Sequence, residues 1–210
     1  MGAHCCHTPA PPAADPRLRR ALWMALLVNG AMFGVEILSG LQAGSLALWA
    51  DAIDFLGDTL AYAATLAVLG ASLAARLRVA RVKALMMGAL GLGVLLQALV
   101  RLGDPPLPHA PTMGAVAVLA LAANLGVAWV LYRYREGDAN LRSVWLCSRN
   151  DAIGNLAVMA AALGVLGTGS AWPDLLVAAI MSSLALLGGW QVLRQARGEL
   201  LGQPASDQAH

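Results

Sequence analysis

Six long apolar stretches alternate with short polar segments along this chain. A bilayer core about 30 Å thick is crossed by a helix of about 20 apolar residues. Stretches of this kind lie at residues 20–41, 46–73, 83–102, 112–132, 142–167 and 171–193. Charged residues, glycine and proline separate them, as at Arg76 to Lys83 and at Gly167 to Pro173. The pattern predicts an all-α, polytopic membrane protein with six transmembrane helices.

Composition and charge exclude several other classes. Hydrophobic residues make up 59% of the chain and charged residues only 12%, against roughly 25% charged residues in an ordinary soluble domain. The net charge of +2 is small and the basic residues form no patch, so we expect membrane lipid and no nucleic acid as a partner. Cys5, Cys6 and Cys147 are too few for a disulfide framework.

The basic residues predict the orientation in the membrane. Alternate connections and the two chain ends hold almost all of them: Arg17, Arg19, Arg20, Arg76, Arg78, Arg81, Lys83, Arg133, Arg135, Arg142, Arg194 and Arg197. Loops rich in lysine and arginine stay on the cytoplasmic side. We therefore expect both termini in the cytoplasm and a multi-pass protein of a bacterial inner (plasma) membrane.

Aspartates inside the apolar stretches are the candidate functional residues. Asp51, Asp54 and Asp58 lie in the second stretch and Asp151 in the fifth. An acid in the bilayer core costs about 2.5–3.5 kcal/mol even on insertion scales, and spacings of three and four residues put the first three on one helix face. With a rise of about 1.5 Å per residue, Asp54, Asp58 and Asp151 come near the midplane. These acids predict an intramembrane cation site.

A thiol completes the predicted ligand set. Cys147 lies one helical turn before Asp151, so Asp54, Asp58, Cys147 and Asp151 could supply four ligands to a tetrahedral ion such as zinc. A thiolate also favours soft or borderline metals. The alternative for Cys147 is a small residue of the helix core.

Other polar residues have weaker predicted roles. Asp51, Glu36 and Asn155 are candidates for the ion pathway or for a layer around the ligands, and Asp51 is alternatively a polar residue at a helix start. Asn29 and Asn124 are predicted to form interhelical hydrogen bonds. The cluster of His4, Cys5, Cys6 and His7 could capture metal, although its spacing is not that of a zinc finger; an unstructured terminus is the alternative.

A family resemblance rests on the second stretch. Residues 44–48 (Gly-Ser-Leu-Ala-Leu) and 50–52 (Ala-Asp-Ala), followed by Asp54 and Asp58, resemble the cation diffusion facilitator family of divalent-metal/proton antiporters. The span-2 motif of that family, His-or-Asp-x-x-x-Asp, is matched by these two aspartates.

The fifth stretch resembles the family with one departure. The family carries His-x-x-x-Asp or Asp-x-x-x-Asp there; Asp151 matches the second position and Cys147 stands at the first. Members commonly continue after span 6 into a cytoplasmic metal-binding domain, which we expect to be lacking here. The predicted organisation is a cytoplasmic N-terminal tail at 1–19, a six-helix transmembrane transporter domain at 20–196 and a short cytoplasmic tail at 197–210.

The resemblance implies a transporter without enzymatic activity or a cofactor. It would export Zn²⁺-like ions from the cytoplasm in exchange for protons, with Cd²⁺, Co²⁺ and Fe²⁺ as alternative ions and a homodimer as one assembly. The rival function is a non-transporting membrane accessory or scaffold subunit. An intramembrane aspartyl protease is disfavoured, because Asp58 follows Phe55-Leu56-Gly57 where that class has Gly-x-Gly.

Overall fold

A computed structural model describes residues 16–67, 73–132 and 139–201, with side chains described except at 73–77, 139–150, 195–196 and 198–201. The described residues form six α-helices joined by short connections: α1 (Pro16–Ala43), α2 (Leu46–Ala67), α3 (Leu73–Val100), α4 (Ala110–Tyr132), α5 (Ala139–Thr168) and α6 (Trp172–Leu201). No strand occurs in these ranges. The predicted all-α architecture with six helices is confirmed.

Five of the six helices are long and apolar enough to cross a membrane. The helix that falls short is α2, whose apolar sequence is interrupted by Asp51, Asp54 and Asp58. The helices also extend beyond the predicted spans: α1 begins at Pro16, where the fixed φ of proline suits a first helical turn, and α5 begins at Ala139. The hydrophobic pattern marks the apolar part of a helix and not its polar ends.

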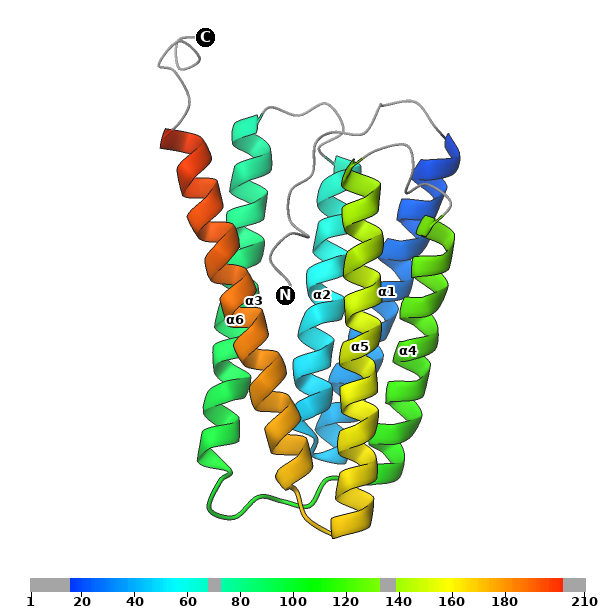
Figure 1. Cartoon of the computed structure of the whole chain (residues 1–210), viewed down its shortest axis with the longest axis vertical. Helices are drawn as coiled ribbons and strands as arrows, with labels where there is room; N and C mark the ends of the chain where they lie inside the picture. The colour runs from blue at the N-terminus through cyan, green and yellow to red at the C-terminus, as the bar shows by residue number, and fades with distance from the viewer. Residues whose placement is uncertain (1–15, 68–72, 133–138, 202–210) are drawn as a thin grey trace.

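The helices stand side by side as an upright bundle (Figure 1). Helices α3 and α6 pair with each other, while α1 packs on α2 and α4, and α4 packs on α5. Helix α2 is central, because it contacts α1, α3, α5 and α6. The start of α1 and the end of α6 lie at the same end of the bundle, at the top of Figure 1.

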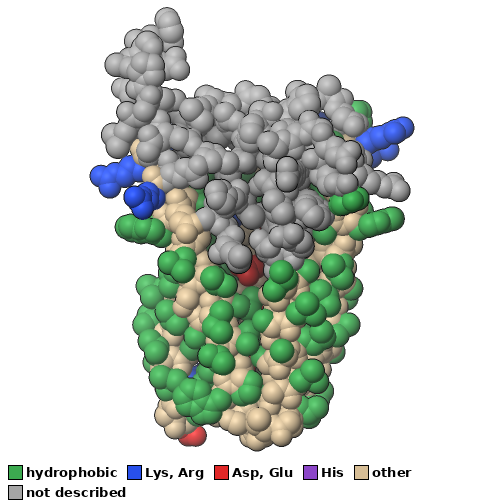
Figure 2. Space-filling model, in the orientation of Figure 1, with side chains coloured by type: hydrophobic (Ala, Val, Ile, Leu, Met, Phe, Trp, Pro, Cys, Tyr) green, Lys and Arg blue, Asp and Glu red, His purple; other side chains and the backbone are tan. Residues whose placement is uncertain are grey.

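The outer surface is predominantly apolar. Large exposed hydrophobic side chains occur along all the helices that face outward, for example Leu38, Val100, Trp129, Leu163 and Trp190. Figure 2 shows hydrophobic side chains spread over the visible face, with lysine and arginine side chains projecting near its upper end. An apolar belt below a basic rim is the surface expected of a protein that is surrounded by lipid.

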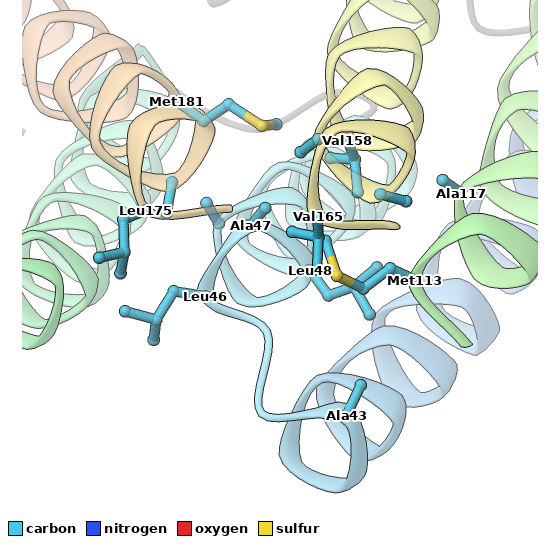
Figure 3. Close-up of a cluster of buried hydrophobic side chains, with 14 of the residues drawn as sticks. Ala43, Leu46, Ala47, Leu48, Met113, Ala117, Val158, Val165, Leu175 and Met181 are labelled. Carbon is cyan, nitrogen blue, oxygen red and sulfur yellow. The ribbon is translucent and has the colours of Figure 1, made fainter. Parts of the chain in front are cut away.

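The largest hydrophobic cluster lies at the lower end of the bundle. Buried side chains from α2, α4, α5 and α6 meet there (Figure 3), including Leu46, Leu48, Met113, Val158 and Leu175. Each of these five is at most 4% exposed. Ala43 of α1 and Val94 and Ala98 of α3 also belong to this core, which therefore joins all six helices.

A polar cap at the same end fixes the start of α2. Gly44 ends α1 with φ +68°, a conformation that favours glycine at a helix C-terminus, and Ser45 Oγ accepts a hydrogen bond from Leu48 N at 3.1 Å as the N-cap of α2. Asp174, at the start of α6, accepts hydrogen bonds from Ser45 Oγ (2.6 Å), Leu46 N (2.9 Å) and Ala47 N (3.1 Å). This Asp174 cap ties α6 to α2.

Candidate functional site

Apart from the Asp174 cap, five acidic side chains inside the bundle form two neighbouring groups. One, which we call the Asp58 group, consists of Asp54, Asp58 and Asp151, with Lys83 beside it. The other, the Glu36 group, consists of four residues from four helices: Glu36, Asp51, Asn124 and Asn155. Both groups lie around the central helix α2.

Asp58 of α2 and Asp151 of α5 are brought together. Their carboxyl groups lie within hydrogen-bonding reach of each other, and Tyr62 hydrogen-bonds to Asp58 from the next turn. One oxygen of each acid, Asp58 Oδ2 and Asp151 Oδ2, is buried without a hydrogen-bond partner. Two facing carboxylates repel each other in a low dielectric, so a proton or a metal cation between them would satisfy both.

Asp54 lies one turn from Asp58 on α2 and is only partly buried. Its carboxyl group is close enough to Asp51 and Asp58 to be repelled by both. Asp151 is also repelled by Asp54. The three predicted acidic ligands therefore share one electrostatic environment.

The complete ligand set stays a prediction. Within the part of the chain that has described side chains, no three His, Cys, Asp or Glu side chains are already close enough to hold one metal ion. Cys147 is in α5, but its side chain lies outside the described residues. The cluster His4, Cys5, Cys6 and His7 also lies outside them.

Lys83 of α3 is a residue of the site that sequence reasoning missed. Its positive charge attracts both Asp54 and Asp58. The side chain lies along Gly57, which stands between these two acids: a Cβ on Gly57 would be 3.7 Å from Lys83 Cε. Lys83 ends a basic stretch, so its sequence position indicated only a cytoplasmic connection. Its location at the start of an apolar stretch was the one feature of the sequence that could have indicated a place inside the bundle.

Gly57 also permits the close approach of α3. A Cβ added there would lie 2.5 Å from Met87 Cε and 2.7 Å from Met87 Sδ. These distances are shorter than any ordinary carbon contact, so glycine is needed if Met87 is to keep its place. The small residue leaves room for the end of the Met87 side chain between α2 and α3.

The Glu36 group is a chain of buried polar side chains. Asn124 Nδ2 donates to Asn155 Oδ1 at 2.9 Å, and Asn155 Nδ2 donates to Asp51 Oδ2 at 2.7 Å. Asp51 in turn lies within hydrogen-bonding reach of the Glu36 carboxyl group. Asp51 thus belongs to a network that joins four helices and does not cap the start of α2.

The two asparagines predicted to bond between helices behave differently. Asn124 makes its interhelical bond to Asn155. Asn29 instead donates to Ala25 O of its own helix at 2.8 Å, and its Oδ1 has no partner among the described residues. The prediction of an interhelical hydrogen bond is therefore confirmed for Asn124 and wrong for Asn29, whose amide nitrogen donates within its own helix.

Comparison with known proteins gives a consistent result. The family model described as the cation efflux transmembrane domain matches residues 22–201. The metal cation efflux system protein CzcD of Cupriavidus metallidurans is 30% identical over 87% of this chain, which spans 61% of the length of CzcD. The zinc transporter ZitB of Escherichia coli is 31% identical to this chain, and the matched region covers 95% of this chain and 68% of the length of ZitB.

The name of a third relative states several transported ions. The cadmium, cobalt and zinc/H(+)-K(+) antiporter of Bacillus subtilis is 25% identical over 81% of this chain and 59% of its own length. The similarity to all three proteins covers most of the helical bundle.

Proposed function

Because the chain belongs to the cation efflux family of multi-pass membrane transporters, which are not enzymes, we propose that it exports divalent ions of the zinc type from the cytoplasm in exchange for protons. The transporter class is the one implied by the span-2 and span-5 motifs. The ion, the direction and the proton exchange are the parts that we propose.

The contact between Asp58 and Asp151 is the observation that carries this proposal. Two helices distant in sequence each present a partly buried carboxyl group to the other, and each group has one buried oxygen without a hydrogen-bond partner among the described residues. Acids in a membrane interior are rarely kept without an ion or a proton to bind. A scaffold protein would have no need of such a pair.

The proposed ligands are Asp54, Asp58 and Asp151, with Cys147 as the fourth. Carboxylate oxygens alone would also suit magnesium or calcium, whereas a thiolate shifts the preference toward zinc, cadmium, cobalt or iron(II). The names of the relatives mention zinc, cadmium and cobalt, which supports the same order of candidates.

Proton exchange follows from competition for the same oxygens. A metal ion binds deprotonated ligands, so its arrival releases protons and its departure allows them to return. If the site opens alternately to the two sides of the membrane, metal movement in one direction is coupled to proton movement in the other. The Lys83 ammonium group stands beside two of the acids and supplies part of the positive charge while no metal is bound.

The orientation follows from the charge distribution. We place both termini in the cytoplasm of a bacterial cell and the Asp174 cap on the outer side of the inner membrane, because the basic residues border the opposite ends of the helices. Export from the cytoplasm then means movement from the basic end of the bundle toward the Asp174 cap.

The test is zinc flux in proteoliposomes under an imposed pH gradient. We expect the wild type to transport zinc, and Asp58→Asn and Asp151→Asn each to abolish that flux while the protein remains inserted. Asp104→Asn is the matched control, because Asp104 is an exposed acid in the connection before α4. Gradient-driven flux at wild-type rate in both site variants, or no flux of any divalent ion in the wild type, would refute the proposal; the second outcome would favour the scaffold function.

A further inference from the structure

The Glu36 carboxyl group is the least satisfied buried acid in the described part of the chain. Glu36 is 0% exposed, and neither of its oxygens receives a hydrogen bond from any N–H or O–H donor among the described residues. Its neighbour is another acid, Asp51, which is 1% exposed. Leaving an ionised carboxylate buried without a donor costs several kcal/mol.

The hydrogen bonds around Asp51 run in one direction. A carboxylate can only accept, so the contact between Asn155 and Asp51 requires the amide nitrogen of Asn155 on that side. The amide oxygen of Asn155 then faces Asn124, which must donate to it. The whole chain therefore points its donors toward Asp51 and stabilises that residue as the anion.

Glu36 can join this series of hydrogen bonds only by donating one to Asp51. Asp51 already accepts from Asn155 through Oδ2, and the Glu36 carboxyl group faces it from α1. If Glu36 carries one proton, its O–H can donate to Asp51, and the buried pair then bears a single negative charge. One added proton satisfies two acids that otherwise oppose each other.

Among the side chains that the structure describes, no positive charge acts on Glu36. The charges that act on it are those of Asp51 and Asp54, both on α2 and both negative. Helix α4, which also packs on α1, has Tyr132 at its last position as its one titratable residue. On α5, Asp151 acts on the same network from one turn before Asn155. A proton is thus the cation that fits beside Glu36.

We propose that Glu36 is a proton-carrying site, separate from the Asp58 group, and that it holds the proton by hydrogen bonding to Asp51. This inference rests on the proposed exchange of metal for protons and names the residue that carries one of those protons. When the proton leaves, the O–H bond of Glu36 breaks, its electron pair stays on the carboxylate and the proton passes to water. Among the described side chains, the hydrogen-bonding neighbour of Glu36 is Asp51, which is not a proposed metal ligand, so proton and metal need not occupy the same atoms.

Helix α5 connects the two sites. Asp151 of the Asp58 group and Asn155 of the Glu36 group are separated by one helical turn and lie on the same face. A shift of α5 that draws Asp151 onto a metal ion also moves the donor that holds Asp51. The hydrogen bonding of the Glu36–Asp51 pair then depends on the occupancy of the metal site, which is the coupling that an exchanger needs.

The decisive variant is Glu36→Gln. Its amide N–H can donate to Asp51 in place of the acid O–H, so the fold and the hydrogen bond are kept, but it cannot release a proton. In proteoliposomes we expect zinc binding within about twofold of wild type, while acceleration of zinc flux by a pH gradient falls by about tenfold or more, which is within the usual range of a coupling free energy. Glu36→Asp, which restores a carboxyl group, should recover part of the acceleration.

Infrared spectroscopy gives a readout that is independent of transport. In wild-type protein treated with a metal chelator, we expect C=O absorption from protonated buried carboxyl groups, in which the component from Glu36 is resolved by using Asp58→Asn as the background and following the band that remains. The band should disappear in Glu36→Gln and shift in Glu36→Asp, so one usable variant is enough. A band that neither substitution changes would overturn the assignment.

The transport results separate this inference from the proposed function. If the wild type shows no gradient-driven zinc flux, the proposed function fails. If wild type and Glu36→Gln show the same gradient-driven flux, the proposed function stands and Glu36 is only a hydrogen-bond donor.

Discussion

Replacing Asp174 should loosen the start of α2 by an amount that the structure allows us to estimate. The carboxylate is 1% exposed and accepts hydrogen bonds from one hydroxyl and two backbone amides, those of Ser45, Leu46 and Ala47. Asp174→Ala removes all three acceptors at once. Asp174→Asn keeps one acceptor oxygen and the shape of the side chain.

The expected magnitude follows from the donors left behind. Loss of a helix N-cap acceptor costs about 0.5–2 kcal/mol, and a buried donor without a partner costs about 1–3 kcal/mol. Ser45 can turn its hydroxyl toward another acceptor, so the two amides decide the result. We expect a local loss of about 3 kcal/mol in Asp174→Ala and about half of that in Asp174→Asn.

Hydrogen exchange at Leu46 and Ala47 is the measurement that reads this directly, in lipid nanodiscs. A loss of about 3 kcal/mol corresponds to exchange faster by about 100-fold. Ser183→Ala is the matched control on α6, because this exposed hydroxyl bonds only to Ala179 O of its own helix. If exchange in Asp174→Ala stays within about twofold of wild type, the carboxylate does not hold the start of α2 and the reasoning fails.

Three further substitutions test the polar interior and its packing. Asn155→Leu leaves two buried partners unsatisfied, so thermal unfolding in detergent should show a loss of about 2–4 kcal/mol; an unchanged melting temperature would contradict this network. Lys83→Gln removes the positive charge beside the acids, so zinc should bind several-fold more tightly in a metal titration. Arg78→Gln, an exposed control on the same helix, should not change zinc binding. Weaker zinc binding in Lys83→Gln would show that the lysine assists the metal. Gly57→Val displaces the flexible end of Met87 and should cost about 1 kcal/mol, the low end for overpacking. The double variant with Met87→Ala should recover most of the loss, and no recovery would locate the strain elsewhere.

The helices could be predicted because the membrane sets a strict length requirement. Six apolar stretches of sufficient length predicted six helices, and the structure contains them. The start of α5 at Ala139 was missed, because the polar turns that extend a helix beyond its apolar part have no such requirement. Asp58 and Asp151 could be matched in depth from their positions in their stretches, and the structure brings them into contact.

The rest of the site depends on contacts that sequence spacing does not encode. Lys83 has the same appearance as the other basic residues at a helix end, and only the packing of α3 on Gly57 brings it to the acids. Asp174 looks like an acid that stabilises the first turn of its own helix, yet its oxygens bind the start of α2. A residue that serves a different helix can be recognised only when both helices are in place.

The three aspartates of α2 have a consequence for how this protein is made. A helix that carries Asp51, Asp54 and Asp58 enters a bilayer poorly by itself, but α1 is synthesised first, and its Glu36 can share a proton with Asp51. The α1–α2 hairpin can therefore leave the insertion machinery as one unit with one of its acids already neutralised by a neighbour. Asp58 must wait for α5, which emerges much later in synthesis. The order of translation thus makes the early hairpin the stage at which membrane insertion of this chain is most sensitive to substitution.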